Sequence, residues 1–130
     1  MDLIEKAKGY YRAYERHDPD AVARELAEGF TFTSPFDDAI GREEYFRRCW
    51  PKEPLHQKFD FVAVAQDGDR VTVIYQCMLR RPNAVHPDMT FCNAEMLAFE
   101  DGKLKSVTVF FGDPPSGQTR HQFAVQCGAG

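Results

Sequence analysis

The sequence predicts a single α+β domain, in which helices pack on one face of a strongly curved antiparallel or mixed sheet. Helical patterns dominate the first 50 residues, and strand patterns dominate after them. The later strands are separated by two tight-turn signals, DGD at 67–69 and DG at 101–102, which are typical of hairpins. With 130 residues, of which 43% are hydrophobic and 13% aromatic, the chain is long and apolar enough to form a compact core.

Three helices are expected in the first half. Apolar residues from Leu3 to Tyr14 recur every three or four positions, which indicates one face of an amphipathic helix. Asp18 and Pro19 have the residue types of an N-cap and a first helical turn, so a second, short helix is expected to run from there to Gly29. The stretch REEYFRRCW at 42–50 predicts a third helix with an aromatic face.

Strand patterns account for the rest of the domain. Residues 30–34 alternate in the manner of a strand that Pro35 ends, and PFDDAIG at 35–41 is expected to be a turn. Four further strands are predicted at 56–66, 70–81, 89–100 and 103–113. The domain is therefore expected to span residues 1–113, followed at 114–130 by a tail with at most one short strand.

Composition argues against several classes of partner. The net charge is −4 and the basic residues are scattered, so a nucleic-acid partner is not expected. No apolar run approaches the ~20 residues that span a bilayer, and the N-terminus lacks a signal-peptide core, which predicts a soluble, cytoplasmic protein without a membrane partner. The four cysteines form no CxxC pair, and GxGxxG and Walker motifs are absent, so neither a metal nor a cofactor is expected.

The order of elements, with YYRAYERHDPDAVARELAEGFTF near the start and FEDGKLKSVTVFFG near the end, resembles the NTF2-like (cystatin-like) superfamily. Within it, the chain is most similar to the SnoaL-like and ketosteroid-isomerase-like branch, over residues 3–113. The resemblance implies a cone-shaped domain with an apolar pocket for a small molecule, and a homodimer paired through the outer sheet face. It says little about chemistry, because this fold hosts isomerases, cyclases, dehydratases, hydrolases and non-catalytic binders.

In ketosteroid isomerases a tyrosine and a protonated carboxylic acid form an oxyanion hole, and an aspartate acts as base. The resemblance implies Tyr10 as the tyrosine and Glu95 as the acid. Period-2 alternation independently places Glu95 on one strand face with Phe91 and Leu97, where burial would raise its pKa and leave a neutral donor near pH 7. Two alternatives stay open: Glu95 faces solvent or pairs with an arginine, and Tyr10 is a plain core aromatic.

The base is where this sequence departs from that pattern. The matching position, immediately before a proline, is Ser34, and a serine without a paired histidine is a poor proton acceptor. Asp37 and Asp38 follow closely and are candidates for the role. Aspartates also favour turns and helix starts, so the pair is expected to serve the turn.

Two functional hypotheses follow. The first is a cofactor-independent isomerase- or cyclase-type enzyme acting on a small apolar carbonyl compound, with Tyr10 and Glu95 as donors and Asp37, Asp38 or a substrate group handling the proton. The second is a non-catalytic binding protein that has lost the base. In both, the expected substrate-binding residues are Tyr14, Ser34, Trp50, Phe91, Asn93, Leu97, Val107, Val109 and Phe111.

Overall fold

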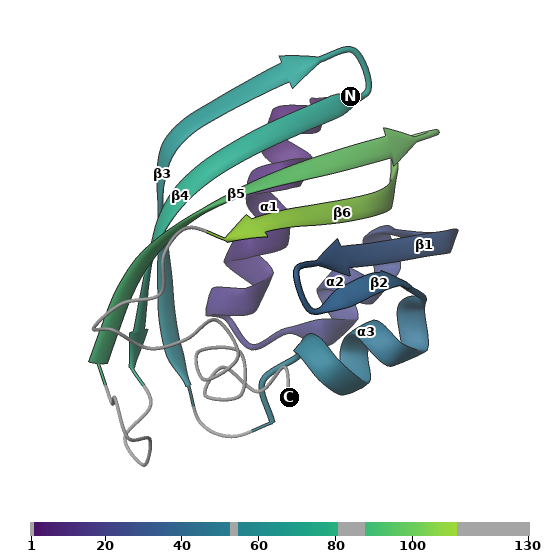
Figure 1. The fold of residues 1–130 in the computed structure, drawn as a ribbon. Helices are drawn as coiled ribbons and strands as arrows, with labels where there is room; N and C mark the ends of the chain where they lie inside the picture. The colour runs from purple at the N-terminus through teal and green to yellow at the C-terminus, as the bar shows by residue number, and fades with distance from the viewer. Residues whose placement is uncertain (1, 53–54, 81–87, 112–130) are drawn as a thin grey trace.

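The computed structural model describes residues 2–52, 55–80 and 88–111, and within these ranges three helices pack against one six-stranded sheet (Figure 1). The elements are α1 (Leu3–Glu15), α2 (Pro19–Glu25), β1 (Leu26–Ser34), β2 (Asp37–Ile40), α3 (Arg42–Cys49), β3 (His56–Asp67), β4 (Arg70–Arg80), β5 (Asp88–Glu100) and β6 (Lys103–Phe111). The strand order is β2-β1-β6-β5-β4-β3. Only the β1–β6 pair is parallel among these neighbours, so the sheet is mixed and the predicted α+β class is confirmed.

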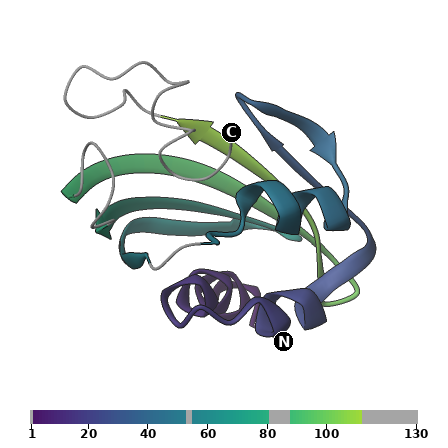
Figure 2. The same ribbon diagram turned by 90° about the horizontal axis from the view of Figure 1, so that it is seen from below.

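The sheet is strongly curved and encloses α1 on its concave side. Figures 1 and 2 show the long strands β3 to β6 bending across α1, while α3 covers the end formed by β1 and β2. Register shifts occur in β3 at Phe61/Ala63 and in β5 at Ala98/Phe99, where an irregularity of this kind increases the local bend. The curvature therefore leaves one sheet face concave and covered by helices, and the other convex.

Capping residues set the helix starts. Asp2 accepts hydrogen bonds from the backbone N–H groups of Ile4 and Glu5 and so begins α1. The predicted N-cap of α2 is confirmed, because the Asp18 side chain accepts from the Ala21 N–H and Pro19 opens the helix.

The predicted end of α2 at Gly29 is wrong. The helix ends at Glu25, and Leu26 already belongs to β1, where it is buried and pairs with Leu104 of β6. Helical periodicity continued past Glu25 in the sequence, but pairing with a strand nearly 80 positions away decided the conformation. Local propensity is a weak guide where such tertiary pairing is available.

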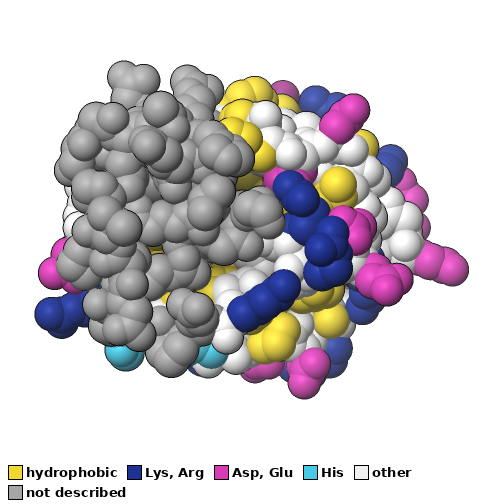
Figure 3. Space-filling view, turned by 60° about the horizontal axis from the view of Figure 1, so that its bottom comes forward, with side chains coloured by type: hydrophobic (Ala, Val, Ile, Leu, Met, Phe, Trp, Pro, Cys, Tyr) yellow, Lys and Arg dark blue, Asp and Glu magenta, His cyan; other side chains and the backbone are white. Residues whose placement is uncertain are grey.

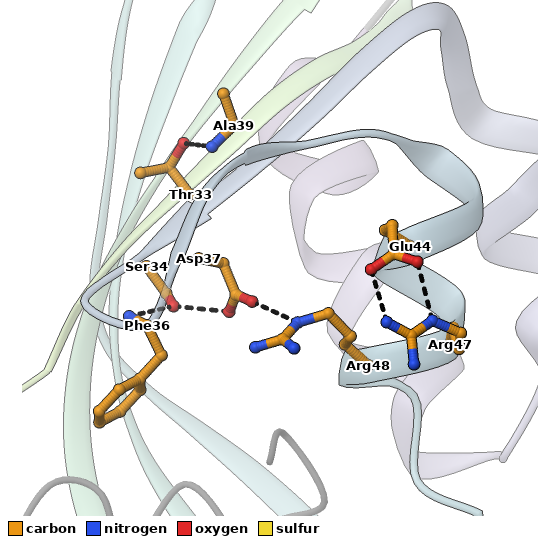
Figure 4. Close-up of polar contacts among 8 residues, drawn as sticks. All are labelled: Thr33, Ser34, Phe36, Asp37, Ala39, Glu44, Arg47 and Arg48. Carbon is orange, nitrogen blue, oxygen red and sulfur yellow. Dashed lines mark hydrogen bonds and ion pairs between the residues drawn. The ribbon is translucent and has the colours of Figure 1, made fainter.

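The predicted turn at 35–41 is also too long. Residues 37–40 form the strand β2, which pairs with β1 through Phe32 and Ile40, and only Pro35 and Phe36 are left to make the turn. Ala39 has a positive φ of 47°, and its N–H donates to the Thr33 hydroxyl across the hairpin (Figure 4). The hairpin thus presents Asp37 to α3 rather than to open solvent.

Strict alternation in β4 separates the two sheet faces. Val71, Val73, Tyr75, Cys77 and Leu79 are buried against the helices, and the residues between them are exposed. The same alternation in β5 buries Asn93, Glu95, Leu97 and Phe99, with Phe91 partly buried, as predicted.

Charged side chains of both signs occupy the surface. Figure 3 shows Lys and Arg side chains beside Asp and Glu side chains on one face, with apolar side chains among them. Ion pairs such as Lys6–Glu25 and Glu44–Arg47 join these charges.

No helix in the described ranges has the length and apolar character needed to cross a membrane. The predicted tail at 114–130, and with it the domain boundary, lies outside the described residues.

Candidate functional site

A cavity of about 160 Å³ lies between α1 and the concave face of the sheet. Most of its wall is apolar, with Phe32, Leu55, Phe59, Leu79, Phe91 and Val109 among the lining residues. The polar groups come from a few positions: tyrosines of α1 and β4, Gln57 of β3, and Asn93 and Glu95 of β5. An apolar cavity with a small number of converging polar groups is the usual form of a small-molecule site.

Glu95 is the central polar residue of this cavity. Its side chain is buried, with 7% of the residue exposed, and both carboxyl oxygens accept hydrogen bonds. The Tyr11 hydroxyl donates to Oε1 at 3.0 Å, and the Tyr75 hydroxyl donates to Oε2. Asn93 in turn donates from Nδ2 to the Tyr75 hydroxyl at 3.3 Å. Helix α1 and two adjacent strands therefore fix the carboxyl group together.

Burial raises the pKa of Glu95 to about 7, although the hydrogen bonds from Tyr75 and Tyr11 act in the opposite direction. Removal from water disfavours the carboxylate, whereas donors to its oxygens stabilise it. Near neutral pH both protonation states are therefore populated. Such a carboxyl can accept or release a proton under ordinary conditions.

A second group of hydroxyls forms a tyrosine cluster of Tyr10, Tyr14 and Tyr45. The Tyr45 hydroxyl lies 2.6 Å from that of Tyr10 and also bonds to that of Tyr14. Three hydroxyls carry three protons, and the two bonds use two of them, so one O–H is left; when Tyr45 donates one of the two bonds, that spare O–H is on Tyr10 or Tyr14. Both of these residues line the cavity. Burial raises the pKa of all three, which keeps the hydroxyls protonated.

The structure places several of the predicted residues together at the cavity. Tyr10, Tyr14, Phe91, Asn93, Glu95 and Val109 all line it. Tyr10, expected to act with Glu95 as a donor to the same ligand oxygen, bonds to Tyr45, whereas the neighbouring Tyr11 bonds to Glu95. Adjacent residues on a helix point about 100° apart, so the two tyrosines reach different neighbours.

Other predicted binding residues lie away from the cavity wall. Leu97 and Val107 are fully buried in the core. Trp50 stacks on the Tyr14 ring, with centroids 4.3 Å apart, and supports that ring from outside the cavity. The side chain of Phe111 is outside the described residues.

Ser34 and Asp37 belong to the β1–β2 hairpin (Figure 4), as does Asp38, and none of the three lines the cavity. The Ser34 hydroxyl donates to Asp37 Oδ2 at 2.8 Å and accepts from the Phe36 N–H. Asp37 Oδ1 pairs with Arg48 Nε of α3 at 2.7 Å, and the Asp37 side chain is only 2% exposed. Asp38 is exposed to solvent. Both aspartates therefore belong to strand β2 rather than to the turn itself, and Asp37 is held by Ser34 and by Arg48 of α3.

Sequence reasoning missed Tyr11, Tyr75, Tyr45 and Gln57. Alternation in β4 could have placed Tyr75 on the inner face, where it lies opposite Asn93. Tyr45 and Gln57 carried no comparable signal, because their positions depend on how α3 and β3 pack.

Potential metal ligands and nucleophiles are few in this site. In the part of the chain that the structure describes, no three His, Cys, Asp or Glu side chains gather as a metal site. Cys49 lines the cavity, but burial, and next the nearby charge of Asp37, raise the pKa of its thiol to about 12. It is therefore protonated at neutral pH and unreactive.

Comparisons with known proteins agree with this fold. The SnoaL-like domain family matches residues 7–107. An NTF2-like protein of unknown function from Burkholderia pseudomallei has a TM-score of 0.70 and 18% identity, over 86% of this chain and 92% of its own. An LEH-like epoxide hydrolase of M. tuberculosis has a TM-score of 0.67 and 16% identity, over 84% and 81%.

A third similar structure, TerC co-crystallised with polyporic acid, has a TM-score of 0.63 and 14% identity, over 84% of this chain and 90% of its own. At these identities the solved structures establish the fold alone. No protein with a curated description matches the chain. The family match covers most of the sequence and confirms the NTF2-like resemblance, and the chain therefore belongs to the SnoaL-like domain family.

Proposed function

We propose that the protein is an isomerase- or cyclase-type enzyme that moves a proton on a small, mainly apolar carbonyl compound. The observation that carries this proposal is the Glu95 carboxyl, which is buried in the wall of an apolar cavity with a pKa of about 7. Enzymes of either type remove a proton from the carbon beside a carbonyl, and a base with a pKa near the working pH is best suited to that step.

In this proposal Glu95 acts as the base. Its two oxygens already accept from Tyr11 and Tyr75, so the carboxylate is held in one orientation while a lone pair remains on each oxygen for an incoming proton. When Glu95 takes the proton, the buried charge is neutralised, which the apolar surroundings favour. This role differs from that of the neutral donor expected from the sequence, and it removes the need for Ser34, Asp37 or Asp38 as base.

In this proposal the tyrosine cluster stabilises the negative charge that develops on the carbonyl oxygen of the substrate. When Tyr45 donates one of the two bonds, the spare O–H is on Tyr10 or Tyr14 and can donate to that oxygen, and the hydrogen bonds through Tyr45 polarise this donor further. Donors that are already oriented in a water-poor site stabilise an enolate more than water does.

The family and its fold are compatible with such chemistry. Neighbours of the same fold include an epoxide hydrolase and a protein crystallised with polyporic acid, so this architecture can hold small molecules in those proteins. The proposal that this chain also acts on a small molecule rests on its own cavity and on Glu95.

A non-catalytic small-molecule binding protein is the second candidate. Ser34, at the position of the base in ketosteroid isomerases, has its hydroxyl engaged by Asp37 and the Phe36 N–H, away from the cavity. That observation favours a pocket that has kept its shape without an aspartate base.

Exchange of carbonyl α-protons for deuterium separates the two candidates without knowledge of the natural product. Wild type is incubated with 2-tetralone or cyclohexanone in D₂O near neutral pH, and loss of the α-proton signals is followed by NMR. Exchange above background that disappears in Glu95→Gln and persists in Glu100→Gln, an exposed glutamate on the same strand, supports the enzyme. Saturable ketone binding with background exchange supports the binding protein instead.

We also propose that two copies pair through the convex sheet face. Val62, Ile74, Met78 and Phe110 are large apolar residues exposed by 40–67%. Ile74 lies opposite Ala94, and Ala94 lies opposite Phe110, so an apolar row crosses β4, β5 and β6. Exposed apolar rows of this kind favour association.

The cytoplasmic location stays a prediction of the sequence.

A further inference from the structure

Gln57, on β3, has a buried amide nitrogen that lacks a partner. Its Nε2 is inaccessible to solvent and makes no hydrogen bond within the described structure, and the residue lines the same cavity as Glu95. A buried donor without a partner destabilises the folded state, and buried polar groups in folded proteins are mostly satisfied. An unpaired donor in a cavity wall is therefore explained if a ligand supplies the missing acceptor.

Strand register places Gln57 far from Glu95 along the cavity. Gln57 lies opposite Leu79 of β4, and Leu79 lies opposite Met89, six residues before Glu95 on β5. Six residues along a strand span on the order of 20 Å. The distance between the two side-chain ends is shorter, because the sheet bends and both side chains are long. The wall between them contains Phe59, Cys77 and Phe91. The cavity thus has a polar group at each end and an apolar middle.

We infer that Gln57 is a specificity-determining residue, whose amide donates to an acceptor oxygen at the end of the ligand remote from Glu95. The inference deepens the proposed function and rests on it, since the other end of the same ligand meets Glu95 and the tyrosine cluster. The ligand is then a slender molecule with two oxygen-bearing ends and an apolar centre. A cavity of about 150 Å³ holds one benzene ring, so the 160 Å³ here suits a compound with one ring.

Two matched probes test this inference. 4-Ethylphenol carries a hydroxyl at one end only, and 4-hydroxyacetophenone has a carbonyl acceptor at the other end. Dissociation constants for both are measured by isothermal titration calorimetry with wild type, Gln57→Leu and Gln57→Glu. Gln66→Leu is the control, because Gln66 is an exposed glutamine on the same strand whose amide bonds to the Gly68 carbonyl.

Wild type should bind 4-hydroxyacetophenone about five- to tenfold more tightly than 4-ethylphenol, the value of one neutral hydrogen bond. Gln57→Leu should remove this preference while keeping the affinity for 4-ethylphenol, and Gln66→Leu should keep the preference. Gln57→Glu, which replaces the amide donor with a carboxylate, should reverse it. If Gln57→Leu does not fold, the reversed probe preference of Gln57→Glu alone tests the inference.

An equal preference in wild type and both Gln57 variants would overturn the role of Gln57 and leave the proposed function standing. Failure of wild type to bind either probe would instead overturn the small-molecule pocket itself. The ligand-free protein offers a second readout, because Gln57→Leu removes an unsatisfied donor and should raise the urea midpoint, whereas Gln66→Leu should not. A lowered midpoint in ligand-free Gln57→Leu would show that the amide already has a partner, which also overturns the inference.

Discussion

The hydroxyl of Tyr11 donates a hydrogen bond of 3.0 Å to Oε1 of Glu95, and this bond ties helix α1 to strand β5 inside the domain. Tyr75 of β4 donates to the other oxygen of the same carboxyl. Both donors act on a group whose burial raises its pKa to about 7. The protonation of Glu95 is thereby coupled to the packing of the helix on the sheet, which makes it measurable both as stability and as a titration.

The free energy of unfolding should fall as pH rises from about 4.5 to about 7. In this window the buried Glu95 of the folded state keeps a proton that the unfolded state, with an ordinary pKa of 4.5, has lost. Rising pH therefore favours unfolding, by about 3 kcal/mol across the window. Glu95→Gln lacks this titration. As pH rises from 5 to 8, wild type should therefore lose most of this free energy of unfolding, whereas the variant should not.

Urea denaturation at several pH values measures this effect, with Glu100→Gln as the control at an exposed glutamate. The control should keep the slope of wild type. Parallel pH profiles for wild type and Glu95→Gln would contradict the assignment of a raised pKa to Glu95.

Tyr11→Phe should raise the pKa of Glu95 further above 7. The substitution removes a donor that stabilises the carboxylate, and a hydrogen bond worth about 1.5 kcal/mol corresponds to about one pH unit. Tyr10→Phe is a close control, because Tyr10 precedes Tyr11 on α1 but bonds to Tyr45. The side-chain carboxyl signal of Glu95 in ¹³C NMR reports both titrations. A larger displacement in Tyr10→Phe than in Tyr11→Phe would reverse the assigned partners.

Much of the fold was predictable, because its signals are local. Asp18 and Pro19 mark the start of α2 by their own chemistry, and alternation through Val71, Val73 and Tyr75 records which face of β4 is buried. The end of α2 was not predictable from local signals, since Leu26 joins β1 only because Leu104 is beside it.

The site was predictable on β5 and much less so elsewhere. Period-2 alternation is rigid, so Asn93 and Glu95 could be assigned to the inner face from sequence alone. Helix α1 buries a wider stripe that includes both Tyr10 and Tyr11, and which hydroxyl meets Glu95 depends on angles that no sequence period records. The same holds for Gln57, whose environment is set by the pairing of β3 with β4.

Arg48→Met should destabilise the protein by about 3 kcal/mol. The Asp37 side chain is 2% exposed, and Arg48 is its cation, so the substitution leaves a buried carboxylate with the Ser34 hydrogen bond alone. Arg47→Met is the matched control on the same helix, because the Arg47–Glu44 pair is exposed and screened by water, so its loss should change the stability far less.

Urea denaturation of both variants and of the double variant Asp37→Asn/Arg48→Met checks this ion pair. The double variant should recover part of the loss, since it no longer buries an unpaired charge. If Arg47→Met and Arg48→Met lose similar amounts of stability, the buried Asp37–Arg48 pair contributes no more than the exposed Arg47–Glu44 pair.

Phe110→Lys should convert a dimer into monomers, if the convex face of the sheet is the contact between two copies. Phe110 is 54% exposed and lies in one row with Ala94 and Ile74, so a lysine there places a charge in the middle of the proposed apolar contact. Sedimentation velocity should give twice the mass of the chain for wild type and the mass of one chain for Phe110→Lys. Glu28→Lys, an exposed position on β1, should stay dimeric. A monomeric wild type at every concentration measured, or a dimeric Phe110→Lys, would remove this face from consideration.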